Sequence, residues 1–89
     1  MRVLIIRIDH LGDVILTTPL IRSVAKAGHA VEFLSRKATE PAVRHNPNIT
    51  ACWTLEDVAP SFPRGWHQLA RWLRDRRYDA LLIPHGKPK

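Results

Sequence analysis

Short runs of consecutive apolar residues recur along the chain, and each run predicts a strand that is buried on both faces of a sheet. The first run contains an uninterrupted apolar segment from Val3 to Ile6. The four predicted strands are residues 2–8, 30–35, 49–55 and 78–84. Between them the apolar positions change to a helical spacing. The predicted helices are residues 12–27, 37–45 and 65–77.

Proline and glycine indicate where these helices bend and stop. Pro19 lies inside the first helical segment, so the first turns of that helix are predicted to be kinked away from the rest. Gly28 is a favourable residue for ending it. Pro60 and Pro63 fall within residues 56–64, which are predicted to form a loop.

The last predicted helix carries the most regular apolar stripe. Its predicted buried face consists of Trp66, Leu69, Ala70 and Leu73, at the spacing i, i+3, i+4 and i+7. Trp72 lies off this stripe and is expected to be half exposed, and the arginines are expected on the other faces.

Alternation of strands and helices with short connections predicts an α/β fold with a parallel sheet. The expected strand order is 3-2-1-4, which is half of a Rossmann-like layer. With 89 residues the chain is at most one small domain. The fourth strand is expected to leave an unpaired sheet edge, and the helix expected after it is missing, so we interpret the sequence as an incomplete domain. The alternative is a complete small domain that dimerises through this edge.

The net charge of +6 arises from 14 basic and 8 acidic residues, and the excess is local. The basic cluster consists of Arg64, Arg71, Arg74, Arg76 and Arg77. Such a cluster favours anionic partners, and it is equally typical of a solvated helix face. The sequence leaves both interpretations open.

A single cysteine, Cys52, excludes an internal disulfide, and the histidines have no metal-ligand spacing, so no metal site is predicted. Cys52 is expected to be a small buried hydrophobe in a reducing cytoplasm. The N-terminal apolar run is too short for a signal peptide. No stretch approaches the ~20 apolar residues of a membrane span.

The segment from Arg7 to Arg22 carries the candidate chemistry. It places Gly12 and Asp13 where the first strand gives way to a helix, beside the crevice in which α/β sheets bind ligands. Asp13 is either a residue that stabilises the start of a helix or a reactive acid. Asp9 either caps the first helix or touches a substrate, and His10 faces either a ligand or solvent. The segment has one glycine and lacks the GxGxxG and Walker patterns that hold phosphates.

This segment closely resembles the N-terminal signature of the family 9 glycosyltransferases, the heptosyltransferases that build the inner core of lipopolysaccharide. Two further blocks support the resemblance. Asn46-Pro47-Asn48-Ile49 is similar to the family's Asn-Pro-x-Ile-Asp segment, and Tyr78 to Gly86 is similar to its Tyr-Asp-x-x-Ile-Asp-x-x-Gly strand. The resemblance implies a GT-B fold, of which residues 1–89 are an incomplete N-terminal, acceptor-side domain without the C-terminal nucleotide-sugar domain.

The resemblance also implies a reaction. Heptose passes with inversion from ADP-heptose to a hydroxyl of the lipopolysaccharide core, with Asp13 as the candidate general base. It implies acceptor contacts by Gly12, His85 and Gly86, although Pro84 stands where the family often has aspartate. No cofactor is implied. The expected location is the cytoplasm, with peripheral contact at the inner membrane, and the isolated chain is expected to be inactive.

Two other functions remain as alternatives. The arginine-rich helix also fits a small basic α/β module that binds nucleic acid or another anionic partner without catalysis, although no nucleic-acid motif is present. An accessory half-domain that pairs with a separate chain is the other alternative.

Overall fold

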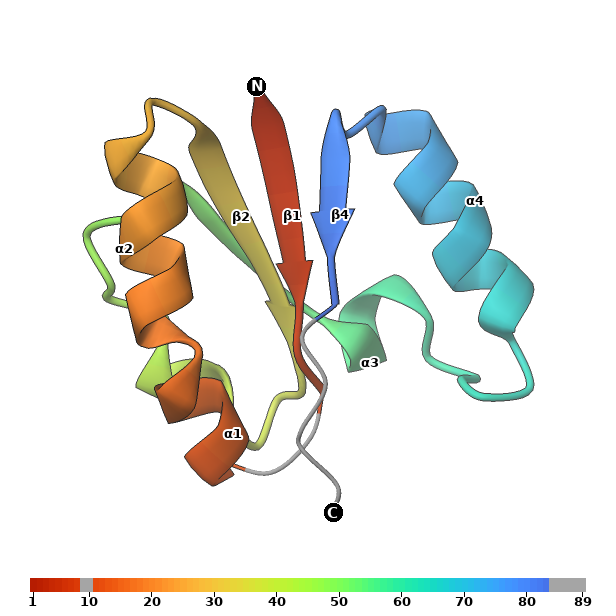
Figure 1. The fold of residues 1–89 in the computed structure, drawn as a ribbon. Helices are drawn as coiled ribbons and strands as arrows, with labels where there is room; N and C mark the ends of the chain where they lie inside the picture. Colours follow the sequence, from red (N-terminus) through yellow and green to blue (C-terminus); the bar gives the residue numbers. More distant parts are fainter. Residues whose placement is uncertain (9–10, 84–89) are drawn as a thin grey trace, which may run out of the picture.

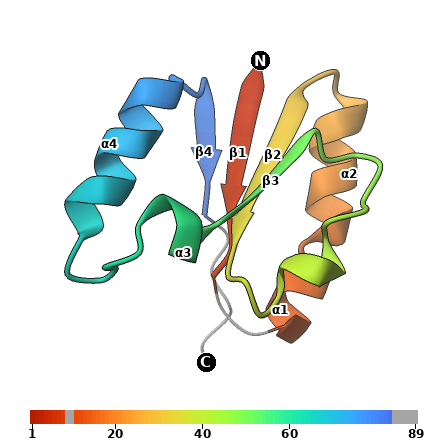
Figure 2. The ribbon, with the colours of Figure 1, turned by 180° about the vertical axis from the view of Figure 1, so that it is seen from behind.

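A four-stranded parallel sheet in the order β3-β2-β1-β4 forms the centre of the computed structural model, as the sequence predicts (Figure 1). The structure describes residues 1–8 and 11–83, with the backbone alone for residues 11 and 13. The elements are β1 (Arg2–Ile6), α1 (Leu11–Leu16), α2 (Thr18–Lys26), β2 (Ala30–Ser35), the 3-10 turn η1 (Glu40–Ala42), β3 (Ala51–Thr54), α3 (Leu55–Val58), α4 (Trp66–Arg76) and β4 (Ala80–Leu82). Helices α1 and α2 lie on one face of the sheet, and α3 and α4 lie on the other (Figures 1 and 2).

Alternate residues of β1 point to the two faces and define two parts of the core. Val3 and Ile5 belong to the cluster on the α2 side, where Ile21 of α2 is fully buried. Leu4 and Ile6 belong to the cluster on the α4 side. Because β1 is covered on both faces, it needs apolar residues at every position, which explains its continuous apolar run.

The predicted bend at Pro19 is confirmed as a break between α1 and α2. The helix is interrupted at Thr17, and Pro19 occupies the first turn of α2, where its missing N–H costs no hydrogen bond. The hydroxyl of Thr18 donates to the carbonyl of Ile15 at 2.9 Å, which supplies a hydrogen bond at the break. Gly28 has φ of +94°, a left-handed conformation that favours glycine after a helix end.

Two predicted segments between β2 and α4 differ from the structure. The helix predicted over residues 37–45 is only the 3-10 turn η1 flanked by turns, because Pro41 has no N–H with which to continue a helical ladder. The loop predicted over residues 56–64 is entered through the short helix α3. The sequence signal for α3 is a threonine followed three positions later by an acid, and Thr54 Oγ1 donates to Asp57 Oδ2 at 2.8 Å.

Helix α4 is confirmed, but it is rotated relative to the predicted stripe. Trp66 is 65% exposed, whereas Trp72 packs with Leu69 and Leu73 against the sheet. Arg76 also turns inward, with its guanidinium 4.4 Å from the ring centroid of Trp53. With 11 residues, α4 is the longest helix in the described ranges, and none of their helices is long and apolar enough to cross a bilayer.

The inward turn of Arg76 is explained by a buried acid on the neighbouring sheet surface. Glu32, in the middle of β2, is 7% exposed. Its Oε1 accepts hydrogen bonds from Trp53 Nε1 at 2.8 Å, Arg76 Nη2 at 3.0 Å and the hydroxyl of Tyr78 at 2.5 Å. Its Oε2 accepts from Arg2 at 3.2 Å. These contacts join β1, β2, β3 and α4.

The Glu32 contacts also shift two pKa values. Burial alone raises the pKa of Glu32, but donors from Tyr78, Trp53 and Arg2 and the charge of Arg76 outweigh burial, so the net pKa lies below its usual range. Burial, followed by donation to the Glu32 carboxylate, raises the pKa of Tyr78 to about 12. Glu32 is therefore ionised and Tyr78 neutral at pH 7.

Candidate functional site

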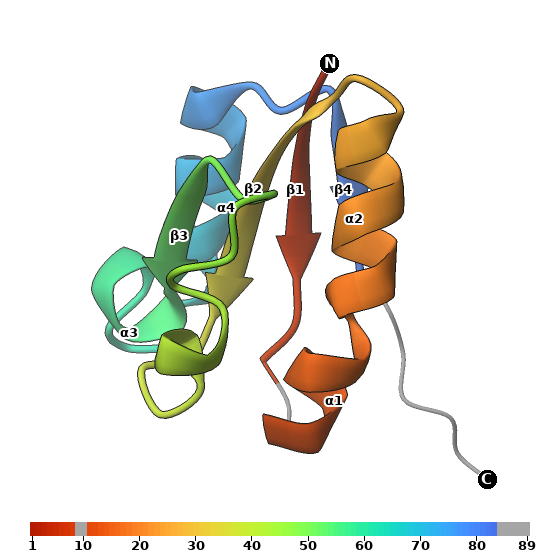
Figure 3. The ribbon, with the colours of Figure 1, turned by 90° about the vertical axis from the view of Figure 1, so that its left-hand side faces the viewer.

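The carboxyl ends of the parallel strands meet at one edge of the sheet, and α1 lies at this edge (Figures 1 and 3). In open α/β sheets, ligands bind outside this edge. The chain leaves β1 at Ile6 and enters α1 at Leu11, so the β1–α1 junction opens directly onto it. We take this carboxyl edge as the candidate site.

The backbone at the start of the junction is hydrogen bonded to β2. The backbone N–H of Arg7 donates to the carbonyl of Leu34 at 3.0 Å, which extends the pairing with β2 beyond the end of β1. Arg7 is only 4% exposed. A buried arginine directly after a strand is unusual, and it places a positive charge at the carboxyl edge.

Gly12 lies exposed in α1, and a Cβ built on it meets no atom of the described residues within 4 Å. No described residue therefore fills the space over Gly12. Packing does not demand a glycine at this position, because an alanine side chain would fit.

The structure brings the backbone of Asp13 to the carboxyl edge, as the third residue of α1. Its side chain lies outside what the structure describes, so its role as a base stays a prediction. Asp9, His10, His85 and Gly86 also lie outside the described residues. The acceptor contacts of His85 and Gly86 therefore stay predictions.

A buried serine at the same edge was not predicted. Ser35 is the last residue of β2 and is fully buried, and within the described part of the chain its hydroxyl has no hydrogen-bond partner. Buried hydroxyls nearly always have one. The sequence signal was a polar residue that ends an apolar run, at the same end of the sheet as the β1–α1 junction.

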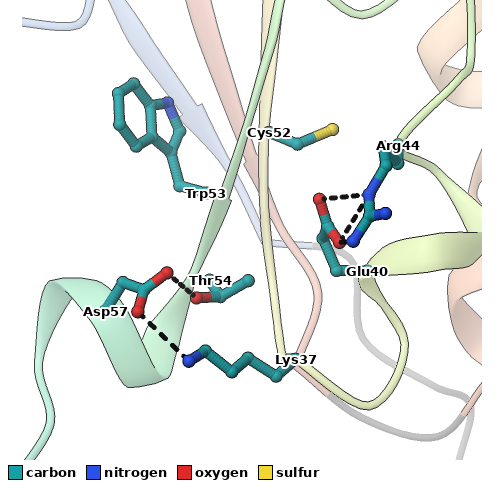
Figure 4. A pocket seen from close by; sticks show the side chains of 7 residues that line it. All are labelled: Lys37, Glu40, Arg44, Cys52, Trp53, Thr54 and Asp57. Atoms are coloured by element: carbon teal, nitrogen blue, oxygen red, sulfur yellow. Dashed lines mark hydrogen bonds and ion pairs between the residues drawn. The ribbon is translucent and has the colours of Figure 1, made fainter.

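A cavity of about 490 Å3 opens beside the end of β3 (Figure 4). Its lining residues are Lys37, Glu40, Arg44, Cys52, Trp53, Thr54 and Asp57. Arg44 pairs with Glu40 at 2.6 Å, and Lys37 pairs with Asp57 at 3.4 Å. Because these charges neutralise one another within the cavity, it offers no excess charge for a ligand. Gly12 is not among the described residues that line this cavity.

Cys52 is not a reactive thiol in this setting. It is partly buried against the α2-side core, with its Sγ 3.7 Å from the carbonyl oxygen of Val43. Burial, followed by the charge of Glu40, raises its pKa, which keeps the thiol protonated at neutral pH. Within residues 1–8 and 11–83, no three His, Cys, Asp or Glu side chains gather as a metal site would require.

The predicted basic cluster divides into two parts. Arg76 belongs to the Glu32 contacts, and its guanidinium lies over aromatic rings. The other four arginines are exposed, and two of them, Arg71 and Arg74, line a hollow of about 370 Å3 on the outer side of α4 with His67 and Ala70.

A crystal structure described as the glycosyl transferase family 9 from Veillonella parvula is similar to this chain, with a TM-score of 0.74 and 26% sequence identity. The match covers 94% of this chain and 26% of that chain, so the chain spans about a quarter of its neighbour. No protein-family model matches the sequence, and a comparison with curated proteins finds no match. The structural match supports a family 9 glycosyltransferase fold, of the Rossmann-like kind found in GT-B enzymes.

Proposed function

We propose that the chain is the acceptor-side part of an inverting glycosyltransferase of family 9. Its carboxyl edge holds the sugar hydroxyl that receives the transferred residue. The observation that carries this proposal is the structural match over 94% of the chain.

In the proposed reaction, Asp13 is the general base. Its carboxylate accepts the proton of the acceptor hydroxyl while the hydroxyl oxygen attacks the anomeric carbon of the donor sugar. A carbon–oxygen bond forms, and the bond from the anomeric carbon to the diphosphate breaks on the opposite side. The nucleoside diphosphate leaves with the bonding electron pair, and the anomeric configuration inverts in one step.

The donor and acceptor follow from the sequence blocks that resemble heptosyltransferases. ADP-heptose is the proposed donor, and a sugar of the lipopolysaccharide inner core is the proposed acceptor. We propose a cytoplasmic enzyme that works at the inner membrane, a location that suits both this donor and this acceptor. Gly12 supports the acceptor side of the proposal, because no described residue fills the space over it.

The proposal can be tested in a chimera in which this chain replaces the matched segment of the Veillonella parvula protein. We expect the chimera to transfer heptose from ADP-heptose to an inner-core acceptor. Asp13→Asn is expected to lower kcat by about 10²–10⁴-fold, the usual contribution of a general base. The matched control is Asp75→Asn, because Asp75 is an exposed acid on α4.

Three results would count against the proposal. Asp13→Asn with an unchanged kcat would remove Asp13 from the reaction. An equal loss in Asp75→Asn would show a general effect of lost charge. A folded chimera that binds ADP-heptose without transferring it would contradict the assignment of this chain to the acceptor side.

A further inference from the structure

We propose that the outer side of α4 docks on the headgroups of an anionic lipid bilayer. The α4 docking face consists of Trp66, His67, Arg71 and Arg74. This inference stands on the contacts of α4 alone and does not depend on the transfer reaction.

The α4 docking face lies opposite the side of the helix that packs on the sheet. Leu69, Trp72 and Leu73 make the inner side. One turn of an α-helix takes 3.6 residues, so His67, Arg71 and Arg74 fall on the outer side. All three are exposed, and they line the hollow of about 370 Å3.

The arginines of this face are free to bind anions. Within the described ranges, neither Arg71 nor Arg74 forms an ion pair, whereas Arg36, Arg44 and Arg76 each pair with a glutamate. The sequence contains no acid between residues 58 and 74, and Arg64 adds an exposed cation before the helix. Clustered, unpaired cations attract the negative surface of anionic lipids.

The apolar part of the face favours a bilayer over a nucleic acid. Trp66 is 65% exposed at the start of α4. The segment before it adds the exposed prolines Pro60 and Pro63 and a half-buried Phe62. Tryptophan is enriched at the membrane–water interface, and helices that lie there combine basic side chains with aromatic ones.

The direction of α4 determines the orientation that the protein would have on a membrane. β4 follows α4 and runs parallel to β1, and Figure 1 shows that α4 runs against the strands. The Trp66 end of α4 therefore lies at the same end of the molecule as α1. Docking through this end would bring the carboxyl edge close to the lipid surface.

Sedimentation of the whole chain with vesicles tests the proposal. We expect binding to vesicles of equal parts phosphatidylglycerol and phosphatidylcholine, and much weaker binding to pure phosphatidylcholine. Each basic side chain near such a surface contributes about fivefold to affinity. The double variant Arg71→Gln with Arg74→Gln should then bind about 25-fold more weakly.

The control double variant is Arg22→Gln with Lys26→Gln, which removes two exposed cations from α2 on the other layer. It should lose far less affinity than the α4 double variant. Circular dichroism spectra should show that both are folded. An equal loss in the two double variants would overturn the docking face, because net charge alone would then explain binding.

Fluorescence quenching by brominated lipids supplies a second readout. Quenching should occur on binding and should largely disappear in Trp66→Phe, because Trp53 and Trp72 are packed in the core. Quenching that persists in Trp66→Phe would overturn the proposed orientation. Failure to bind the anionic vesicles, or tighter binding to a random oligonucleotide than to them, would overturn the proposal altogether.

Discussion

At the residue scale, one buried carboxylate organises the α4 side of the molecule. Glu32 receives donors from a tryptophan, a tyrosine and two arginines. A buried acid is costly unless its oxygens are hydrogen bonded. The four donors provide these hydrogen bonds. Through its bond to Arg76, Glu32 also holds α4 against the sheet.

Glu32→Gln is expected to lower the free energy of unfolding by about 1–3 kcal/mol at pH 7, because donors to a buried carboxylate lose a charged acceptor. Chemical denaturation measures this. Glu40→Gln, which removes a surface pair with Arg44, should have a much smaller effect. Equal effects of the two variants would contradict a special role for Glu32.

The lowered pKa of Glu32 predicts how its contribution to the free energy of unfolding depends on pH. Because the folded pKa lies below the ordinary value of 4.5, the contribution is complete above pH 4.5. It is lost as the pH falls through the folded pKa. The difference in unfolding free energy between wild type and Glu32→Gln should therefore shrink below pH 4.5. A difference that stays constant down to pH 2 would contradict the account.

Tyr78 allows a direct titration, because it is the only tyrosine of the chain. Its pKa of about 12 in the folded protein lies above the ordinary value of 10. The associated stability is therefore complete below pH 10 and is lost as the pH rises toward 12. Ultraviolet absorbance of tyrosinate should follow this shift, and the pKa should fall in Glu32→Gln. A pKa near 10 for Tyr78 in the folded protein would contradict the predicted shift.

At the element scale, two glycines with different backbones should respond oppositely to alanine. Gly28→Ala should destabilise the protein by about 1 kcal/mol, because alanine is strained at φ of +94°. Gly12→Ala should stabilise α1 by up to about 1 kcal/mol, because Gly12 is helical and no described residue would meet the added methyl group. Thermal unfolding of both variants measures these effects. A loss of stability in Gly12→Ala would show that the space over Gly12 is not free.

The elements that the sequence predicted correctly are those with local signals. The continuous apolar run of β1 and the alternation of strands with helices allowed the strand order to be predicted. Pro19 allowed the break before α2 to be predicted. The rotation of α4 was not predictable, because the burial of Arg76 depends on Glu32, 44 positions away. The helix α3 has a local signal in Thr54 and Asp57, which the prolines after it obscured.

The candidate site was predictable only in its backbone position. A strand that ends before Gly12 and Asp13 places them at the carboxyl edge, and the structure agrees for their backbones. The cavity beside β3 was not predictable, because Lys37, Arg44 and Asp57 reach it from separate segments. Ser35 ends a strand, but only the packing of the sheet shows that it is buried.

At the scale of the whole molecule, the fold separates two surfaces. The carboxyl edge carries the β1–α1 junction. The outer side of α4, on the layer opposite α2, carries Arg71 and Arg74, which form no ion pair with any described residue. The Trp66 end of α4 and helix α1 lie toward the same end of the molecule (Figure 1). An acceptor sugar attached to a membrane lipid would therefore meet the carboxyl edge of a docked protein.

The measurement that most directly tests acceptor binding at the carboxyl edge is a nuclear magnetic resonance titration of the isotope-labelled chain with inner-core oligosaccharide. The account predicts that the amide signals of Gly12, Asp13 and Val14 shift and saturate together, and that a maltose oligosaccharide leaves them unchanged. Shifts confined to α4, or no shifts at millimolar acceptor, would contradict it.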